Sequence, residues 1–347
     1  MKKLLYYSLF ALTLFAVYSC KDDDVKIAVS GLTIDKGSIT LVEGETITLT
    51  ATVTPDNATD KAVSWTSSDA SVASVNDGKV TAVKEGEATI TARSGFVSVV
   101  IWVTVGSHNL YTAKAFSVSA TKKVYFSSGN LQYHCKNKEW RFAPFQYYRI
   151  GDENENISDD YDGYIDLFGW GTGNNPTLTS KDDNDYATFT DWGTNVDGGN
   201  VWQTLTNDEW IYLIKGRENA SEKYGVAEVA DVQGLILLPD NWVLPAGLSF
   251  NSGVASDFGW KFYQTKNNYS SGDWHKMESA GAVFLPTTGS RHGTNVGSGV
   301  GECGYYWSSS ANNDGNAWDL EFFSDSVGLG YPGDGSFAHS VRLVRPL

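Results

Sequence analysis

The chain has 347 residues, which at roughly 100–200 residues per domain allows two or three domains, each with its own core. Charged residues make up only 19% and aromatic residues 13%, a composition too apolar for a disordered chain. The formal net charge of −15 excludes the basic surface that binds phosphates, so nucleic acid is not expected as a partner.

The N-terminus carries a targeting pattern. Lys2 and Lys3 precede an apolar run from residue 4 to 18, shorter than the ~20 residues that span a bilayer. This predicts a signal peptide over residues 1–19. The run ends in VYSC at residues 17–20, which resembles the cleavage site of bacterial lipoproteins. The resemblance implies that Cys20 is acylated, with fatty acids such as palmitate, and becomes the mature N-terminus. The alternative is an ordinary signal peptide with an incidental cysteine.

Residues 20–27 are expected to form a lipidated acidic tether. Asp22, Asp23 and Asp24 resemble the tag that sends some Gram-negative lipoproteins to the outer face of the outer membrane, whereas a solvated spacer is the plainer interpretation. An outer-membrane location facing the cell exterior follows from the resemblance. In such an oxidising compartment Cys135 and Cys303 form an even pair, and whether they join in a disulfide stays open.

Residues 28–105 have a period of two. Threonines 46, 48, 50 and 52 alternate with apolar residues, and so do the valines that follow residue 96, which predicts strands with one buried face. Asp77 and Gly78 between two apolar runs indicate a tight hairpin turn. Short strands at this spacing favour a β-sandwich.

Several segments of this region resemble the group 2 bacterial immunoglobulin-like domain. They are GLTI (31–34), VEGE (42–45), VTP (53–55), VSWTSSD (63–69), VASV (72–75) and GKVTAV (78–83). The resemblance implies an immunoglobulin-like sandwich that acts as a spacer in a surface protein, with direct ligand contact as the alternative.

A linker is expected over residues 106–116, and residues 117–347 then alternate short apolar runs with loops rich in glycine, asparagine and aspartate. Thr206 and Glu209 fit a capping box, with Leu205 packing on Trp210, so a helix is predicted to begin there and to end at Gly216. A second helix is predicted near residues 274–280. Helices followed by strands suggest an α+β unit.

Five motifs of this second region resemble the C-terminal module of bacterial surface lipoproteins whose fold is similar to the C-type lectin fold. They are DLFGWG (166–171), LLPDNW (237–242), AGAVFLP (280–286), GYYWSS (304–309) and SVRLV (340–344). The resemblance implies a C-type-lectin-like ligand-binding domain over residues 117–347.

The tail from residue 304 to 345 mixes a regular framework with residues of little shared character. A period of two places Trp318, Leu320 and Phe322 on one face of a strand and Asp319, Glu321 and Phe323 on the other, and the second face suits recognition more than a core. The tail resembles the variable repeat of proteins diversified by a retroelement, a fixed lectin-like frame that carries variable positions. The alternative is a glycine-rich terminal hairpin that tolerates substitution. The expected ligand-binding residues are Asp314, Trp318, Asp319, Glu321, Phe323, Asp325, Tyr331, Asp334, Phe337 and His339, with Trp307 and Arg342 in the frame.

Chemistry beyond binding is not expected. The five histidines lie in unlike contexts and there is no nucleophile elbow, so no catalytic residue is assigned. No metal site and no cofactor are assigned, although acidic clusters at residues 159–166 and 182–185 leave a structural calcium ion open.

Together these observations predict a multi-domain chain, an all-β immunoglobulin-like sandwich followed by an α+β C-type-lectin-like domain. The expected function is that of a surface-displayed outer-membrane lipoprotein, held to the membrane by its lipid, that binds an extracellular protein or glycan and is not an enzyme. A structural subunit of the cell surface, such as a pilus-tip or assembly subunit, is the alternative.

Overall fold

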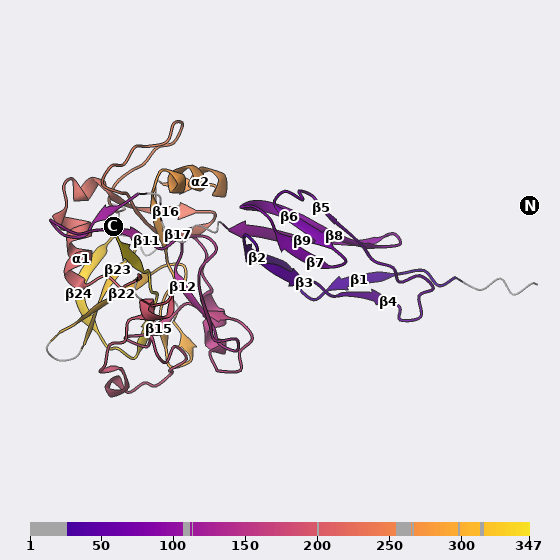
Figure 1. Ribbon diagram of the computed structural model, residues 1–347, viewed down its shortest axis with the longest axis horizontal. Helices are drawn as coiled ribbons and strands as arrows, with labels where there is room; N and C mark the ends of the chain where they lie inside the picture. Colours follow the sequence, from indigo (N-terminus) through magenta and orange to yellow (C-terminus); the bar gives the residue numbers. More distant parts are fainter. Residues whose placement is uncertain are drawn as a thin grey trace, which may run out of the picture. The chain divides into compact units, whose positions relative to one another are not determined.

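A computed structural model gives the structure of the chain and describes residues 26–106, 112, 114–199, 201–254, 265, 267–297, 299–312 and 316–347 (Figure 1). The predicted signal peptide, Cys20 and most of the tether therefore lie outside the described residues. By its internal contacts the chain divides into two compact units. One comprises residues up to 39, 46–81 and 87–103, and the other comprises residues 40–45, 82–86 and 104–347.

Residues 31–106 form nine strands in three small sheets, with the orders β2-β9-β8-β5, β3-β7-β6 and β1-β4. The strands are β1 (Gly31–Ile34), β2 (Ser38–Val42), β3 (Thr46–Thr48), β4 (Ala51–Thr54), β5 (Ser64–Ser67), β6 (Ala73–Asn76), β7 (Lys79–Ala82), β8 (Gly86–Ser94) and β9 (Val97–Gly106). The predicted alternation is confirmed, since Ile101, Val103 and Val105 are fully buried while Trp102 is largely exposed. The turn at Asp77 and Gly78 is confirmed too, because both residues have positive φ, as a tight hairpin between β6 and β7 requires.

The threonine-rich run at residues 46–53 is not one continuous strand. Its first part, β3, pairs with β7, whereas its second part, β4, pairs with β1 in another sheet. Asp35 holds the break, because its carboxylate accepts a hydrogen bond from the Thr50 backbone N–H at 2.8 Å. The period of two survives the change of sheet, which is why the pattern alone did not show it.

The part of the second unit that follows residue 106 is also mostly β. Five small sheets have the orders β10-β11-β26, β13-β12-β14, β15-β25-β20-β21, β18-β16-β17-β19 and β22-β23-β24. The strands are β10 (Phe116–Ser117), β11 (Lys123–Phe126), β12 (Leu131–His134), β13 (Glu139–Phe142), β14 (Tyr164–Ile165), β15 (Phe168–Gly169), β16 (Tyr224–Val229), β17 (Val232–Leu237), β18 (Asn268–Tyr269), β19 (Val283–Pro286), β20 (Arg291–His292), β21 (Asn295–Val296), β22 (Gly304–Ala311), β23 (Ala317–Phe322), β24 (Val327–Gly333), β25 (Phe337–His339) and β26 (Val344–Pro346). The last strand, β26, returns to pair with β11, so the beginning and the end of this part are joined in one sheet.

Helices are few and short. They are α1 (Asn207–Ile211), α2 (Ser271–Ser279), the 3-10 turns η1 (Gly151–Asn156), η2 (Asp183–Tyr186), η3 (Trp192–Asn195) and η5 (Ala220–Glu222), and the π-helical turn η4 (Tyr212–Gly216). The predicted capping box is confirmed, since the Thr206 hydroxyl accepts from the Glu209 N–H at 3.2 Å and the Glu209 carboxylate accepts from the Thr206 N–H at 2.9 Å. The second predicted helix is α2, which begins three residues earlier than expected because Ser270 caps it.

Several buried aromatic side chains hydrogen-bond to backbone carbonyls far away in the sequence. The Trp307 indole N–H donates to the carbonyl of Phe168 at 2.7 Å, and the Trp170 indole N–H donates to that of Ser308 at 2.9 Å. The Tyr306 hydroxyl donates to the carbonyl of Pro286 at 2.9 Å. These bonds join the tail to earlier parts of the unit. The chain as a whole is mostly β with several sheets, and the lectin-like classification of the second unit stays a prediction.

Candidate binding face

The predicted recognition face lies on the antiparallel sheet of β22, β23 and β24 (Figure 1, yellow). It also includes β25, a strand of another sheet that contacts β22 and carries Phe337 and His339. Leu320 and Phe322 are fully buried on one side of β23, in the same cluster as Trp210 of α1. On the other side Glu321 lies opposite Tyr305 of β22. Phe323 belongs to this second side, because its ring meets that of Tyr305 edge-on at 6.2 Å. The face therefore has an acidic and aromatic character, while its back is core.

Trp318 departs from the predicted alternation. It was expected on the core side with Leu320 and Phe322, yet it is only partly buried. The pairing of β23 with β24 shifts register between Trp318 and Leu320, and such a bulge re-aims the residue at which it occurs. Nothing in the sequence marks this bulge.

His339 is the middle ring of an aromatic stack beneath the face. Its imidazole lies 4.1 Å from the ring of Trp307 and 4.9 Å from that of Tyr305, with interplanar angles of 25° and 24°. Its Nδ1 lies 3.1 Å from Asp319 Oδ2, off the axis that a hydrogen bond needs. The side chains of Asp319 and His339 are only 7% and 8% exposed. These two predicted contact residues thus lie beneath the surface, where they support the face more than they cover it.

The other expected contact residues lie further out. Trp318, Glu321, Phe323 and Asp325 are partly exposed, and Asp334 and Phe337 are exposed. Tyr331 is in β24, and its side chain lies outside the described residues, as does the whole of Asp314. Their role in ligand binding stays a prediction.

Burial and like charge act on the carboxylate of this face. The pKa of Glu321 is raised, first because the side chain is partly removed from water and then because the charge of Asp319 lies nearby; His339 opposes the shift. Burial also raises the pKa of the neighbouring Tyr305 hydroxyl. A partly desolvated carboxylate beside aromatic rings interacts more strongly with a polar or cationic ligand group than one in bulk water does.

Two residues of this region were not found from the sequence. Tyr305 and Trp307 are two residues apart on β22, so their side chains point to the same side of the sheet. The period of two could therefore have placed Tyr305 on the face. His292 of β20 stacks on Phe337 at 4.7 Å, and only the pairing of β20 with β25 brings these two rings together. No local signal in the sequence indicates that pairing.

Arg342, predicted to belong to the frame, is fully buried under the sheet. Its guanidinium donates to Gln146 Oε1 at 2.8 Å and to Asn130 Oδ1 at 3.3 Å. Burial lowers its pKa to about 10, which leaves it charged at neutral pH. The residue therefore ties the tail to the start of the second unit, in a place where a ligand does not reach it.

Neither cysteine of the described residues is in a disulfide, since Cys135 and Cys303 are both free. Asp166 of the first acidic cluster is fully buried and accepts hydrogen bonds from Asn154 and from the Ile150 N–H at 2.9 Å each. In the second cluster Asp182 caps a helical turn. These carboxylates are engaged with protein donors, and calcium in these loops stays a prediction.

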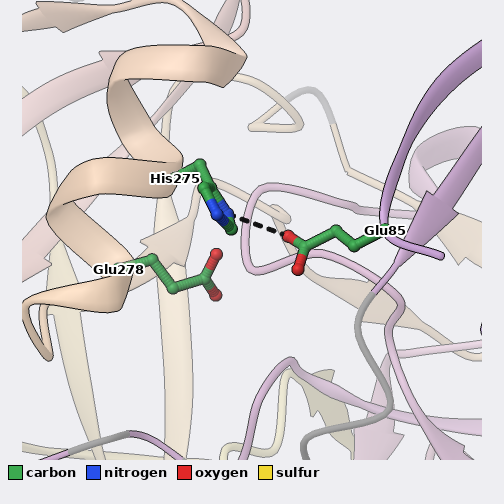
Figure 2. Close-up of side chains that lie close together, drawn as sticks. All are labelled: Glu85, His275 and Glu278. Carbon is green, nitrogen blue, oxygen red and sulfur yellow. Dashed lines mark hydrogen bonds and ion pairs between the residues drawn. The ribbon is translucent and has the colours of Figure 1, made fainter.

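One other group of ionisable side chains converges within the second unit. Glu85, His275 and Glu278 each place one potential ligand atom within 4.8 Å of the other two (Figure 2). Among the described residues they are the sole set of three or more His, Cys, Asp or Glu residues that does so. Sequence reasoning missed this group because Glu85 is 190 residues from His275.

In the described part of the chain, no helix has both the length and the apolar composition that crossing a membrane requires.

The nine-stranded region is of a known class. Residues 28–105 match the family model described as bacterial Ig-like domain (group 2), which confirms the predicted immunoglobulin-like domain. Within known proteins, the chain is 47% identical over 97 residues to an alpha-L-arabinofuranosidase of Bifidobacterium longum subsp. longum, covering 27% of this chain and 9% of that protein. It is 41% identical over 70 residues to an Ig-like virion protein of Serratia phage KSP90, covering 20% and 27%.

Among solved structures, domains 4 and 5 of the S-layer protein SbsC match 22% of this chain and 52% of that chain, with 24% identity and a TM-score of 0.20. The chain spans only 9% of the arabinofuranosidase and 27% of the virion protein, so it shares only a short segment with each of these relatives.

Proposed function

We propose that the chain is a lipid-anchored protein of the outer membrane that binds an extracellular protein or glycan through a C-type-lectin-like C-terminal unit. Cys20 carries the anchor, the group 2 Ig-like domain acts as a spacer, and the face of β22 to β25 contacts the ligand. The occurrence of Ig-like domains in surface-associated proteins supports the cell-surface part of this proposal.

The observation that carries the binding role is the difference in burial between the two sides of β23 and of Phe323, which follows it. Leu320 and Phe322 are fully buried, whereas Glu321 and Phe323 on the opposite side stay partly open to solvent. A core on one side fixes the backbone, so the side chains on the other side are presented in a constant geometry. Aromatic rings and a carboxylate held in this way resemble a combining site, in which rigid aromatic side chains contribute contact area at a low cost in entropy.

The anchor is tested by fractionation. Wild-type protein should be recovered with outer-membrane vesicles and be cleaved by protease added to intact cells. Cys20→Ala removes the acyl acceptor and should release the protein into soluble fractions. If the variant stays with the outer membrane, the lipid anchor is wrong.

Binding is tested with a double variant of the face. We expect Glu321→Ala with Phe323→Ala to lower binding at least tenfold on a glycan array and on a panel of immobilised extracellular proteins. Tyr212→Ala with Glu218→Ala is the matched control, because it removes an aromatic ring and a carboxylate from the segment that follows α1. Trp210 of α1 packs with Leu320 and Phe322, on the other side of β23 from Glu321. Equal binding by both double variants would place the ligand elsewhere, and co-purification with pilus subunits in place of any ligand would favour a structural role.

Diversification by a retroelement is part of the proposal and has its own test. The DNA flanking the gene should hold a second copy of the codons for residues 304–345 that differs only where that copy has adenine, beside a reverse transcriptase gene. A flank without such a copy would mean that the tail is fixed and that one dedicated ligand should be sought.

A further inference from the structure

Three side chains of the second unit point their polar ends at one centre (Figure 2). Nδ1 of His275 lies 3.1 Å from Oε1 of Glu85, and the carboxylate of Glu278 lies beside both. One ligand atom from each of the three residues lies within 4.8 Å of the other two. The group is separate from the binding face on β22 to β25, and the proposed function makes no use of it.

Two of these residues come from the same face of one helix. His275 and Glu278 are three residues apart on α2, so their side chains are neighbours on its surface. The adjoining face of α2 is fixed, because Trp274 and Met277 are fully buried in the core. The helix therefore holds the imidazole and the carboxylate in a constant relation to each other.

The carboxylate of Glu278 is oriented from behind by a buried amide. Gln146 Nε2 donates to Glu278 Oε1 at 2.7 Å. Gln146 is itself fixed, because its Oε1 accepts from the Phe284 N–H at 2.6 Å and from Arg342 at 2.8 Å. A hydrogen bond of this kind, from a rigid residue to a ligating carboxylate, is what typically orients the ligands of a metal ion.

The charge of the group is not balanced by its own members. Two carboxylates, those of Glu85 and Glu278, face a single imidazole, and like charges this close repel each other. Lys276, the nearest cation on the same helix, pairs instead with Asp273 at 2.7 Å. A cation placed between the carboxylates would remove this repulsion.

We propose that Glu85, His275 and Glu278 form a binding site for a divalent transition-metal ion of the zinc type. One imidazole nitrogen and two carboxylates suit such an ion, since imidazole selects against magnesium and calcium. Bond lengths of roughly 2.0–2.2 Å require the three groups to move inward by about 1 Å, which the exposed His275 side chain allows. Its exposure also leaves a coordination position open to water. The ion would cross-link residues of the second unit and stabilise it.

The experiment uses the full chain without an affinity tag, stripped of metal with EDTA and dialysed. Zinc chloride is the probe, with calcium and magnesium chloride as comparisons, followed by titration calorimetry and thermal unfolding. We expect one zinc ion per chain, and at a zinc concentration 100-fold above Kd we expect the midpoint of the second unit to rise by roughly 5–11 °C. Calcium and magnesium should bind at least tenfold more weakly.

Variants decide whether the zinc binds at this site. His275→Ala and Glu278→Gln should each weaken zinc binding at least tenfold and abolish the rise in midpoint. His292→Ala and Glu222→Gln are the matched controls, because they remove a histidine and a carboxylate elsewhere in the unit. If Glu278→Gln lowers the metal-free midpoint, Glu85→Gln tests the same ligand class without disturbing Gln146. The proposal is overturned by sub-stoichiometric binding, by binding that His275→Ala leaves unchanged, or by equal affinity for calcium.

Discussion

Phe322 ends β23, and Phe323 follows it. Substituting each of these neighbours compares the stability that a buried side chain contributes with the stability that a side chain of the binding face contributes. Phe322 is fully buried, and its removal as Phe322→Ala should cost about 3–5 kcal/mol. Phe323 is partly exposed and contacts Tyr305 edge-on, so Phe323→Ala should cost about 1 kcal/mol, the energy of one such aromatic pair. In a unit of this size, 1 kcal/mol shifts the thermal midpoint by roughly 2–4 °C. The expected shifts are therefore roughly 6–20 °C and roughly 2–4 °C.

Tryptophan fluorescence during thermal unfolding of the full chain is the suitable assay, because 10 of the 12 tryptophans lie after residue 105 and report on the second unit. A third variant, Leu320→Ala, should behave like Phe322→Ala, since Leu320 is equally buried. Equal shifts for Phe322→Ala and Phe323→Ala would refute the reasoning, because they would mean that the two sides of the strand are buried alike.

Three further predictions concern caps, packing and pH. Thr206→Ala should lower the stability of the second unit by about 1 kcal/mol in urea unfolding, because it leaves the N-terminus of α1 without its cap, and Thr206→Ser should restore most of the loss. Gly304→Ala should cost about 1–3 kcal/mol, because the added methyl group would overlap the buried ring of Phe322; a neutral effect in the same unfolding assay would show that the ring moves. Burial raises the pKa of Asp166 to about 6, so the folded state holds its proton more tightly than the unfolded state, and the contribution of this group to stability should fall as pH rises from about 4 to 6. Midpoints of Asp166→Asn measured across that range should show a weaker dependence on pH than wild type, and parallel curves would contradict the assignment.

Local patterns were enough to predict the elements that depend on neighbouring residues. The capping box at Thr206 and the turn at Asp77 and Gly78 each depend on a few adjacent side chains, and both are confirmed. The alternation on β9 is confirmed for the same reason. Pairing between distant strands follows from no local pattern, and so the change of sheet after β3 was not foreseen.

The same distinction applies to the binding face. The period of two separated Glu321 and Phe323 from the buried Leu320 and Phe322. It could not show that Asp319 is covered, because the cover comes from His339 and the rings stacked on it. No sequence motif could predict that Glu85 lies close to His275 and Glu278, because these residues come from segments far apart in the chain.

The bonds from buried aromatic side chains to main-chain carbonyls have a consequence for evolution. Every amino acid carries the same carbonyl group, so the acceptors at Phe168, Pro286 and Ser308 stay in place whatever side chain a mutation introduces there. Only the donor of each bond must keep its identity. The acceptor of each of these hydrogen bonds is therefore kept when its residue is substituted. Such genes can accumulate substitutions at the acceptor positions while the fold persists.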